Sequence, residues 1–428
     1  MKLRCLWLAR TLPFPLTAGD RIYSAKLAGA LAISGASVTF VGIGDADGAT
    51  NIPGLRWKAI PGAARSHGRS VFSAMPLVAA RHATSAYQAA IREMAAQGPW
   101  DAIILDQYGM GWVLDHLNTF RPSPLLVFVA HDHETSVTRL QFQDRANALV
   151  TRAYLLQNHL KTRRFERRVV AAADLITAIT AEDRDLFLRD RPGARVLVLP
   201  PGYDGRRVAA HPISRQTPRH IVLLGSYRWS AKQASLKAFL DAADAAMRAA
   251  GIETDIVGDI PDEFARLLVR RYRAVHVVGA VSDTAPYLDA RLAVLAESIG
   301  GGFKLKLLDY VFHRVPVAAL CACTAGVPTT LRDAMLLASD LGALVKTIIS
   351  EIDNTDRLDQ LQQAAFSAAD GAFNWADRGQ ILFDALARLR HPSELPRGRL
   401  AEDRTAKADA ILLSKRGPVR PQMGARVT

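Results

Sequence analysis

A run of glycines is followed within a few residues by two lysines and an aspartate, in the segment Gly300-Gly301-Gly302-Phe303-Lys304-Leu305-Lys306-Leu307-Leu308-Asp309. The preceding residues, 291–296, are typical of a buried parallel strand, and apolar side chains recur at helical spacing after the glycines. Such a strand-to-helix junction offers bare backbone N–H groups and the positive end of a helix to an anion. Because Lys304 and Lys306 add cations and Asp309 follows one helical turn later, the segment suits a nucleotide diphosphate with its ribose. The alternative is an ordinary turn whose lysines are only solvated.

A second polar group, His131-Asp132-His133-Glu134, directly follows residues 125–130, which are typical of a buried strand. Open α/β sheets bind their ligands at the carboxyl ends of parallel strands, where these side chains would lie. His131 would orient a sugar hydroxyl or backbone carbonyls, and Glu134 would hold a hydroxyl or a basic neighbour. Any one of the four is more often a hydrogen-bonded loop residue, but four together favour a site. A metal cluster would fit this spacing, although no separate ligands accompany it.

Composition indicates two domains and a soluble protein. The chain has 428 residues, 49% of them hydrophobic, and a mean hydropathy of +0.06, which allows two large cores and a tail. Its net charge of +13 and pI near 9.9 suit an anionic ligand, an acidic membrane surface or nucleic acid alike. Three cysteines predict neither a disulfide framework nor a zinc site and favour a reducing compartment. With neither a signal peptide nor a membrane span expected, we predict a cytoplasmic protein.

Two successive series of strands and helices organise the chain. In the first, residues 3–9 and 37–41 are predicted strands on either side of a helix that Asp20 caps. The glycine pattern between them is not G-x-G-x-x-G, so NAD is disfavoured. The second series starts at residues 220–224, and a Gly/Ser turn then brings Arg228 and Lys232 to a helix start, where a phosphate would lie. We further predict loop with short elements over 47–80, helices over 336–350, 357–369 and 376–389, and a mostly disordered basic tail from His391.

A long predicted helix over residues 146–173 is strongly basic. Its cationic residues are Arg152, Lys161, Arg163, Arg164, Arg167 and Arg168. They form either a solvated face or a basic surface for anionic lipid or a lipid-phosphate acceptor. Few aromatic residues lie among them, so a stacking platform for nucleic acid is not supported.

The two series, with their anion-ready loops and a closing helix after Phe373-Asn374-Trp375, resemble the family 4 group of retaining glycosyltransferases on the two-Rossmann-domain scaffold called GT-B. The resemblance extends from Leu3 to about Leu389. Its most specific part is the segment 300–309 with Pro316-Val317, which is similar to the family's G-x-G-x-K-x-K-x-x-E…G-x-P-V block. Four further segments are similar to family motifs. Residues 225–229 resemble the motif GS-x-x-W, and residues 14–21 resemble P-x-x-x-G. His131 with Glu134 resembles HN-x-E, and residues 174–183 resemble AD-x-x…T-x-x-D.

The resemblance implies a role for each matched residue. His131 would lie by the sugar near the reacting centre, while Arg228 and Lys306 neutralise the donor diphosphate and stabilise the nucleotide leaving group. Gly19 would approach the diphosphate from the first domain, and Asp309 replaces a glutamate that usually binds the ribose. The other implied donor contacts are Gly225, Ser226, Gly300, Gly301, Gly302, Phe303 and Lys304. Asp132 and Glu134 would contact the sugar or the acceptor.

The sequence also departs from the family pattern. Gly301 stands where the first glutamate of an E-x7-E pair is usual, Glu297 is four residues out of register, and Lys232 stands where we expect asparagine. Asp45-Ala46-Asp47 and Asp183-Arg184-Asp185 resemble the metal-holding D-x-D motif of the other glycosyltransferase scaffold, but neither lies in that context. We therefore expect no catalytic metal and no cofactor other than the nucleotide sugar.

Together these observations predict an α/β protein of GT-B architecture, with two Rossmann-like doubly wound domains facing across a cleft. The expected parts are an acceptor-side domain (1–205), a linker (206–218), a nucleotide-sugar-binding domain (219–372), a helix crossing back to the first domain (373–390) and the tail (391–428). The expected activity is hexosyl transfer, with retention of configuration, to a glycan or lipid-linked acceptor in cell-surface polysaccharide or glycolipid biosynthesis. We expect the protein to make peripheral contact with the anionic inner face of the cell membrane, and to have no nucleic acid partner. The alternatives are a non-catalytic nucleotide- or glycan-binding homologue and a nucleotide-sugar epimerase on the same scaffold.

Overall fold

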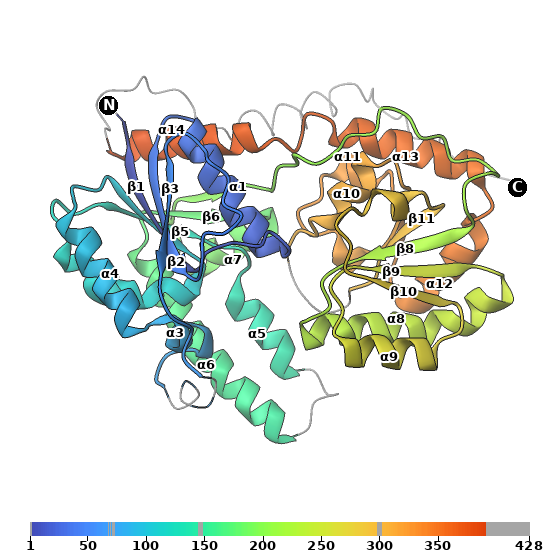
Figure 1. Ribbon diagram of the computed structural model, residues 1–428, viewed down its shortest axis with the longest axis horizontal. Coiled ribbons are helices and arrows are strands. Elements are labelled where there is room, and N and C mark those ends of the chain that lie inside the picture. The colour runs from blue at the N-terminus through green and yellow to red at the C-terminus, as the bar shows by residue number, and fades with distance from the viewer. Residues whose placement is uncertain are drawn as a thin grey trace, which may run out of the picture. The chain divides into compact units, whose positions relative to one another are not determined.

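The computed structural model describes residues 2–66, 68, 70, 73–143, 149–297 and 302–390. Its strands form two separate parallel sheets, one of seven strands and one of six, and helices flank both (Figure 1). This confirms the predicted α/β architecture. The expected basic tail, 391–428, lies outside the described residues, as do Gly300 and Gly301. Within the described ranges, no helix is both long and apolar enough to cross a membrane.

The first sheet has the strand order β3-β2-β1-β4-β5-β6-β7, and every neighbouring pair is parallel. The direction of winding reverses between β1 and β4, and doubly wound sheets bind ligands at such a switch point. The strands are β1 (Arg4–Thr11), β2 (Ser37–Ile43), β3 (Leu55–Ile60), β4 (Ala102–Asp106), β5 (Leu125–Val129), β6 (Leu175–Ala178) and β7 (Val196–Val198).

The second sheet repeats this plan with the order β10-β9-β8-β11-β12-β13, again all parallel, and its switch point lies between β8 and β11. Its strands are β8 (His220–Leu224), β9 (Glu253–Val257), β10 (Val275–Gly279), β11 (Leu292–Leu295), β12 (Val317–Leu320) and β13 (Leu336–Ala338).

The helices follow the strands that they connect. Those of the first half are α1 (Gly19–Ile33), α3 (Leu77–His82), α4 (Ser85–Ala96), α5 (Glu134–Gln143), α6 (Leu149–Ala172) and α7 (Ala181–Asp190), with a 3-10 helix, η1 (Tyr108–Thr119). Those of the second half are α8 (Ser230–Ala249), α9 (Asp262–Arg271), α10 (Lys306–Phe312), α11 (Thr329–Arg332), α12 (Leu341–Glu351), α13 (Thr355–Ala369) and α14 (Trp375–Arg390), with the 3-10 turns η2 (Ala285–Leu288) and η3 (Cys321–Cys323).

The central strands are apolar along their length because helices cover both faces of the sheet. In β1, Trp7 pairs in register with Phe40 of β2 and with Ile104 of β4, and all three side chains are fully buried. The Trp7 and Phe40 rings stack with their centroids 5.8 Å apart. This packing fixes the carboxyl ends of β1 and β4, from which site residues project.

The last helix, α14, returns to the first sheet and lies beside α1 (Figure 1). Trp375 packs edge-on against Tyr23 of α1, with ring centroids 5.6 Å apart. Gly379 is so close to Ala30 that an added Cβ would come within 2.3 Å of the Ala30 backbone. The predicted crossing helix is therefore confirmed, and it needs glycine where the two helices touch.

One local prediction was wrong. Leu336–Ala338, expected to start a helix, forms the edge strand β13, because a short apolar run suits either structure. Residues 47–80, expected to be loop with short elements, contain the strand β3 and the start of α3, which the sequence alone did not place. Strand β3 is an edge strand with partly exposed side chains, so it lacks the continuous apolar run of a central strand.

Candidate active site

The carboxyl ends of β4 and β5 bring a carboxylate and an imidazole together. Asp106 ends β4, His131 closely follows β5, and the Nε2–H of His131 donates to Asp106 Oδ1 at 2.8 Å. The indole N–H of Trp7 donates to the other oxygen of Asp106, also at 2.8 Å. Both His131 and Asp106 are buried, so this bond fixes the tautomer and orientation of the imidazole. Asp106 was not among the predicted site residues, and its place at the end of a strand was the only available signal.

A pocket opens beside this pair at the switch point between β1 and β4. Its lining residues are Ala9, Arg10, Thr11, Pro13, Asp20, Arg21, Ser24, Asp106 and Gln107. Gln107 has a φ of +67°, which a residue other than glycine rarely adopts, so the backbone is strained beside the pocket. The Ser24 hydroxyl lies 3.4 Å from His131 Nε2. A hydroxyl-rich ligand in this pocket would meet both charged and neutral hydrogen-bonding groups.

Asp132 lies against the glycine loop that follows the second sheet's β11. A Cβ added to Gly302 would come within 2.5 Å of Asp132 Oδ1, and Gly302 has a φ of +72°, so only glycine fits there. Among the described residues, Asp132 Oδ1 is buried without a hydrogen-bond partner. Burial, and then the nearby Asp183 carboxylate, raise the pKa of Asp132 to about 6. A buried carboxylate oxygen of this kind suits a ligand hydroxyl that donates to it.

Glu134 begins α5 directly after these residues. Burial raises its pKa to about 8, with further contributions from the carboxylates of Asp132 and Glu166. Glu134 is therefore mostly protonated at neutral pH, so it can donate a hydrogen bond as well as accept one.

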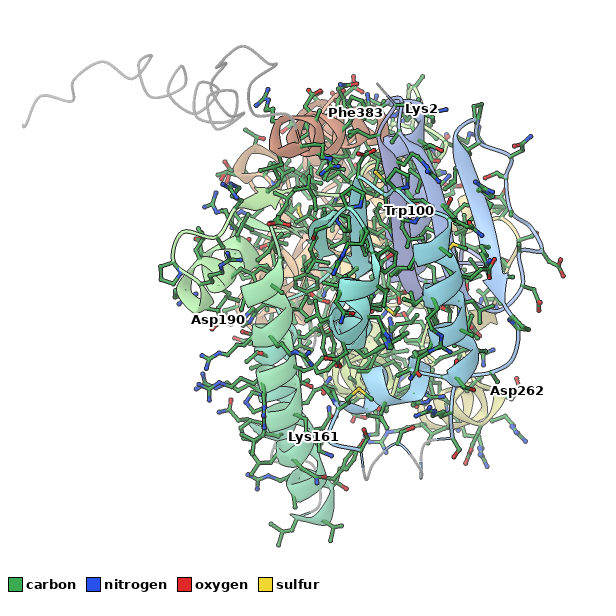
Figure 2. The ribbon with its side chains drawn as sticks, turned by 90° about the vertical axis from the view of Figure 1, so that its left-hand side faces the viewer. Lys2, Trp100, Lys161, Asp190, Asp262 and Phe383 are labelled. Atoms are coloured by element: carbon green, nitrogen blue, oxygen red, sulfur yellow. The ribbon has the colours of Figure 1, made fainter. Side chains whose placement is uncertain are left out.

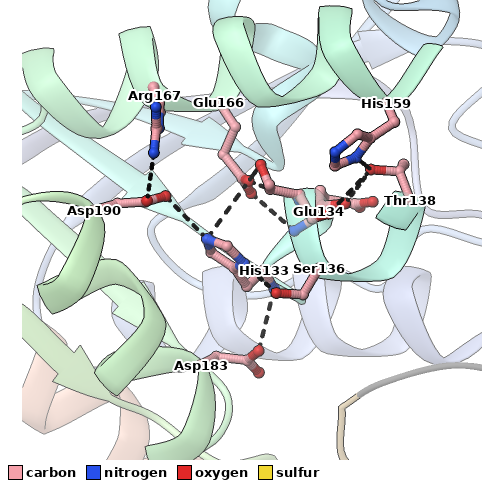
Figure 3. A network of polar contacts seen from close by, with 10 residues as sticks. His133, Glu134, Ser136, Thr138, His159, Glu166, Arg167, Asp183 and Asp190 are labelled. Atoms are coloured by element: carbon pink, nitrogen blue, oxygen red, sulfur yellow. Dashed lines mark hydrogen bonds and ion pairs between the residues drawn. The ribbon is translucent and has the colours of Figure 1, made fainter. Parts of the chain in front are cut away.

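The loop that carries His131 is held from behind by a buried polar network (Figure 3). Glu166 of α6, which is fully buried, accepts the backbone N–H groups of Glu134 at 2.9 Å and Thr135 at 2.8 Å. It thereby satisfies two of the N–H groups that a helix start leaves free. His133 lies between Ser136 and Asp190, with ring nitrogens 2.8 and 3.1 Å from their side-chain oxygens. Glu166 could not be recognised from the sequence, because it lies within a run of basic residues.

The N-terminal glycine loop reaches the segment that carries the lysines. Gly19 begins α1, and a Cβ added there would lie 3.2 Å from Leu305 Cδ1. Leu305 stands between Lys304 and Lys306. The structure thus places Gly19 beside the segment that carries the two lysines.

Lys306 and Glu297 form the charged centre of the second sheet's switch point. Lys306 pairs with the carboxylate of Glu297 and donates to the Leu224 carbonyl, which ends β8, at 2.8 Å. Lys306, Glu297 and Lys232 line a small pocket at this point of the sheet. Burial, and then the charge of Lys306, lower the pKa of Lys232. Glu297 Oε2 is buried and has no hydrogen-bond partner within the described ranges. Glu297, out of register in the motif, therefore belongs to this site in space, as does Lys232.

Arg228 lies outside this pocket. Its side chain is 73% exposed and pairs with Asp259. Gly225 and Ser226, in the same turn as Arg228, directly follow β8. The turn packs closely on Gly258, because a Cβ added to Gly258 would come within 1.8 Å of the Gly225 carbonyl oxygen. The structure thus brings Lys232, rather than Arg228, to Lys306.

Three other predicted donor residues, Phe303, Lys304 and Asp309, lie within a few positions of Lys306 in the sequence. Lys304 lies near Glu297 and Asp132: its charge partly opposes the rise that burial causes in the pKa of Asp132, and it adds to the larger effect of Lys306 in lowering the pKa of Glu297. The Phe303 ring lies 5.5 Å from that of Phe373, just before the crossing helix. Asp309 on α10 is half-buried, and burial raises its pKa although the Tyr203 hydroxyl beside it acts in the opposite direction. Gly300 and Gly301 lie outside the described residues.

The two D-x-D segments are unlike a metal site. Asp45 and Asp47 are exposed in a loop, and Asp183 accepts the backbone N–H of His133 at 3.2 Å. In the part of the chain that the structure describes, no group of three or more His, Cys, Asp or Glu residues is arranged to hold a metal ion.

Comparison with known proteins gives two matching families and many similar folds. Residues 19–202 match the glycosyl transferase 4-like domain, and residues 218–354 match the glycosyl transferases group 1 domain. Sucrose-phosphate synthase from Thermosynechococcus elongatus is 19% identical, with a TM-score of 0.68 over 92% of this chain and 100% of that chain. HepE from Anabaena, solved with UDP and glucose, is 14% identical, with a TM-score of 0.63 over 90% of this chain and 99% of that chain. WaaG, a glycosyltransferase involved in lipopolysaccharide biosynthesis, is 16% identical, with a TM-score of 0.59 over 92% of this chain and 100% of that chain. No curated protein sequence matches the chain significantly.

Two doubly wound parallel sheets, a helix returning from the second to the first, and polar residues at both switch points define an α/β protein of the GT-B fold. The two family matches lie one on each sheet and together cover most of the chain. The protein belongs to the family 4-like glycosyltransferases and is a glycosyltransferase enzyme.

Proposed function

We propose that this enzyme transfers a hexose from a nucleotide sugar to a glycan or lipid-linked acceptor, with retention of the anomeric configuration. The observation that carries the proposal is the group formed by Lys306, Glu297 and Lys232 at the ends of β8 and β11. Cleavage of the donor leaves a nucleoside diphosphate, whose negative charge grows in the transition state. Fixed cations beside it stabilise that charge in a site from which water is largely excluded.

The donor sugar would lie between these lysines and the carboxyl end of β5. Asp132, with its unpartnered oxygen, lies against Gly302, and the Asp106-bound His131 is adjacent in the chain. Asp132 would accept a sugar hydroxyl, and His131 would orient the reacting part of the sugar. The acceptor would enter through the pocket lined by Arg10, Asp20 and Arg21.

We further propose UDP as the donor nucleotide, because HepE was solved with UDP and with UDP-glucose. Lys306, Lys232 and Lys304 supply the charge that a metal ion provides in other transferases, so we expect transfer to continue in a chelator. The reaction would take place at the inner face of the cell membrane, within polysaccharide or glycolipid assembly.

A donor-binding assay tests this proposal most directly. A ligand that binds only the folded state raises the melting temperature, so we would measure Tm with UDP, GDP and ADP and with their glucose derivatives. UDP or UDP-glucose should stabilise the wild type, and Lys306→Ala should abolish the effect, while Lys304→Ala should weaken it less. Because Lys306→Ala leaves Glu297 buried and unpaired, the variant Lys306→Ala with Glu297→Gln serves as the folding control.

Product analysis completes the test. Transfer of labelled glucose to a glycan or lipid extract, with the α-anomer formed from an α-linked donor, would support the proposal. A β-linked product would overturn retention, and an epimerised nucleotide sugar without transfer would overturn the proposed reaction. Stabilisation by no nucleotide at all would overturn the assigned donor site.

A further inference from the structure

Helices α5 and α6 form an antiparallel hairpin that projects from the first sheet (Figure 1). The start of α5 is fastened to α6 because Glu166 accepts the N–H groups of Glu134 and Thr135. Figure 2 shows the N-terminal end of α6 extending beyond the body of the protein, past the labelled Lys161. Nothing in the proposed donor and acceptor sites uses this far end.

The hairpin exposes an unusual amount of large apolar surface. Leu149 and Val150, at the start of α6, are 80% and 83% exposed. Leu140, Leu156 and Leu160 are also exposed, so the hairpin carries five of the ten exposed large hydrophobic residues in the described part of the chain. Single exposed leucines need no explanation, but a group on one projecting element indicates an interaction surface.

Three of these leucines share one side of α6 with two arginines. Leu149, Leu156, Leu160, Arg163 and Arg167 are spaced by 7, 4, 3 and 4 positions, which places them along one line of a helix with 3.6 residues per turn. We call these five residues the α6 stripe. It runs for about 27 Å, apolar in its first half and cationic in its second.

The charge of the hairpin is one-sided. Its described residues include seven arginines and lysines and only two acidic residues, Glu134 and Glu166. Glu166 is fully buried and Glu134 is half-buried in the network behind the active site. Arg163 and Arg164 are exposed, and no ion-pair partner for either is found within the described ranges. Arg167 and Arg168 pair at the surface with Asp190 and Asp115.

We infer that the α6 stripe docks the protein onto an anionic lipid bilayer. An amphipathic helix lying in the membrane interface places apolar side chains among the acyl chains and cations at the phosphates, which matches the composition of the stripe. A second copy of the chain would face this surface with the same positive charge. The stripe has leucine where single-stranded nucleic acid would require stacking aromatics.

Docking would place the active-site loop beside the membrane-bound helix. The stripe spans most of α6, so α6 lies along the bilayer surface rather than entering end-on. Glu166, on the buried side of α6, holds the start of α5, next to His131 and Asp132. The proposed lipid-linked acceptor would then have a route from the membrane to the site, whichever nucleotide the donor carries.

Vesicle co-sedimentation of the full chain, without donor or acceptor, tests the inference. The wild type should bind phosphatidylcholine vesicles that contain phosphatidylglycerol, and bind vesicles of phosphatidylcholine alone at least about tenfold more weakly. Two double variants within the stripe, Leu149→Ser with Leu160→Ser and separately Arg163→Glu with Arg167→Glu, should each weaken binding to the anionic vesicles about tenfold or more. These side chains are exposed, so the variants should keep the wild-type melting temperature.

Helix α9 offers a matched control, because it also carries exposed Leu267 and Val269 beside exposed Arg266 and Arg270. Leu267→Ser with Val269→Ser, and Arg266→Glu with Arg270→Glu, should leave binding unchanged. If the wild type does not bind, if the α6 variants bind as it does, or if the α9 variants lose as much, the inference is overturned. Because no sugar nucleotide is present, failure here leaves the proposed transfer standing, and loss of UDP binding leaves the docking surface standing.

Discussion

The carboxylate of Asp106 holds the imidazole of His131 by a 2.8 Å hydrogen bond between the ends of two neighbouring strands, β4 and β5. The second oxygen of Asp106 is held by the indole N–H of Trp7. With Nε2 engaged by Asp106, His131 has its other ring nitrogen, Nδ1, to offer a substrate. Asp106 is therefore a positioning residue for His131.

Asp106→Asn should lower kcat about ten- to hundredfold, the scale seen when a residue that orients a functional side chain is replaced. The amide oxygen can still accept from the indole N–H of Trp7, but an uncharged amide group replaces the carboxylate oxygen that accepts from His131. Trp7→Phe is the control, since it removes the other bond to Asp106. Because it leaves a buried carboxylate oxygen unpaired and a cavity in the core, it should cost about 3 kcal/mol of stability, with kcat nearly unchanged. Steady-state kinetics and urea unfolding would measure both, and equal kcat in the two variants would contradict the positioning role.

Glu166 should contribute strongly to stability. Glu166→Ala leaves two N–H groups of the α5 start and the Thr135 hydroxyl without their acceptor, so it should cost about 3 kcal/mol. Glu166→Gln keeps one acceptor oxygen and should cost roughly half as much. Urea denaturation measures the difference, and an unchanged midpoint for the alanine variant would show that water replaces the carboxylate.

The strands were predictable where both faces are buried, because such strands are continuous apolar runs. Strands β5, β8 and β11 were found in this way, and the polar residues that follow β5 were recognised because ligands bind at strand ends. The edge strands β3 and β13 were missed because their apolar runs are short or interrupted.

The pairings within the site were not predictable, because they join separate strands. Asp106 and His131 are 25 positions apart, and they meet only because β4 and β5 are neighbours in the sheet. Glu297 is out of register with the family motif, yet its carboxylate reaches Lys306 in space. Motif spacing fixes positions along one loop, whereas strand order decides which loops meet.

Stability should fall as pH rises through the neutral range. The folded-state pKa of Glu134 is raised to about 8 and that of Asp132 to about 6. A raised carboxyl pKa means that the folded state holds a proton that the unfolded state has lost, so its stabilising effect is complete below about pH 4 and fades up to about pH 8.

The slope of the unfolding free energy from Glu134 alone should approach about −1.4 kcal/mol per pH unit between the two pKa values. Glu134→Gln cannot titrate and should flatten the profile between pH 6 and about 8. Urea unfolding at several pH values would measure this, with Glu93→Gln, which alters an exposed carboxylate paired with Lys58, as the control. A wild-type profile that is flat or rises over this range would contradict the raised pKa values.

Gly302→Ala should impair donor binding through a single steric contact. The added methyl would lie 2.5 Å from Asp132 Oδ1 at a backbone φ of +72°. Gly193→Ala is a matched control, since Gly193 has a φ of +83° and no atom within 4 Å of the added methyl. Both variants should lose about 1–2 kcal/mol from backbone strain, but only Gly302→Ala should also raise KM for the donor. If the clash is the cause, Asp132→Ala combined with Gly302→Ala should be less destabilised than the sum of the two single variants, because it removes the oxygen that the methyl meets. Strict additivity would instead show that the two residues do not touch.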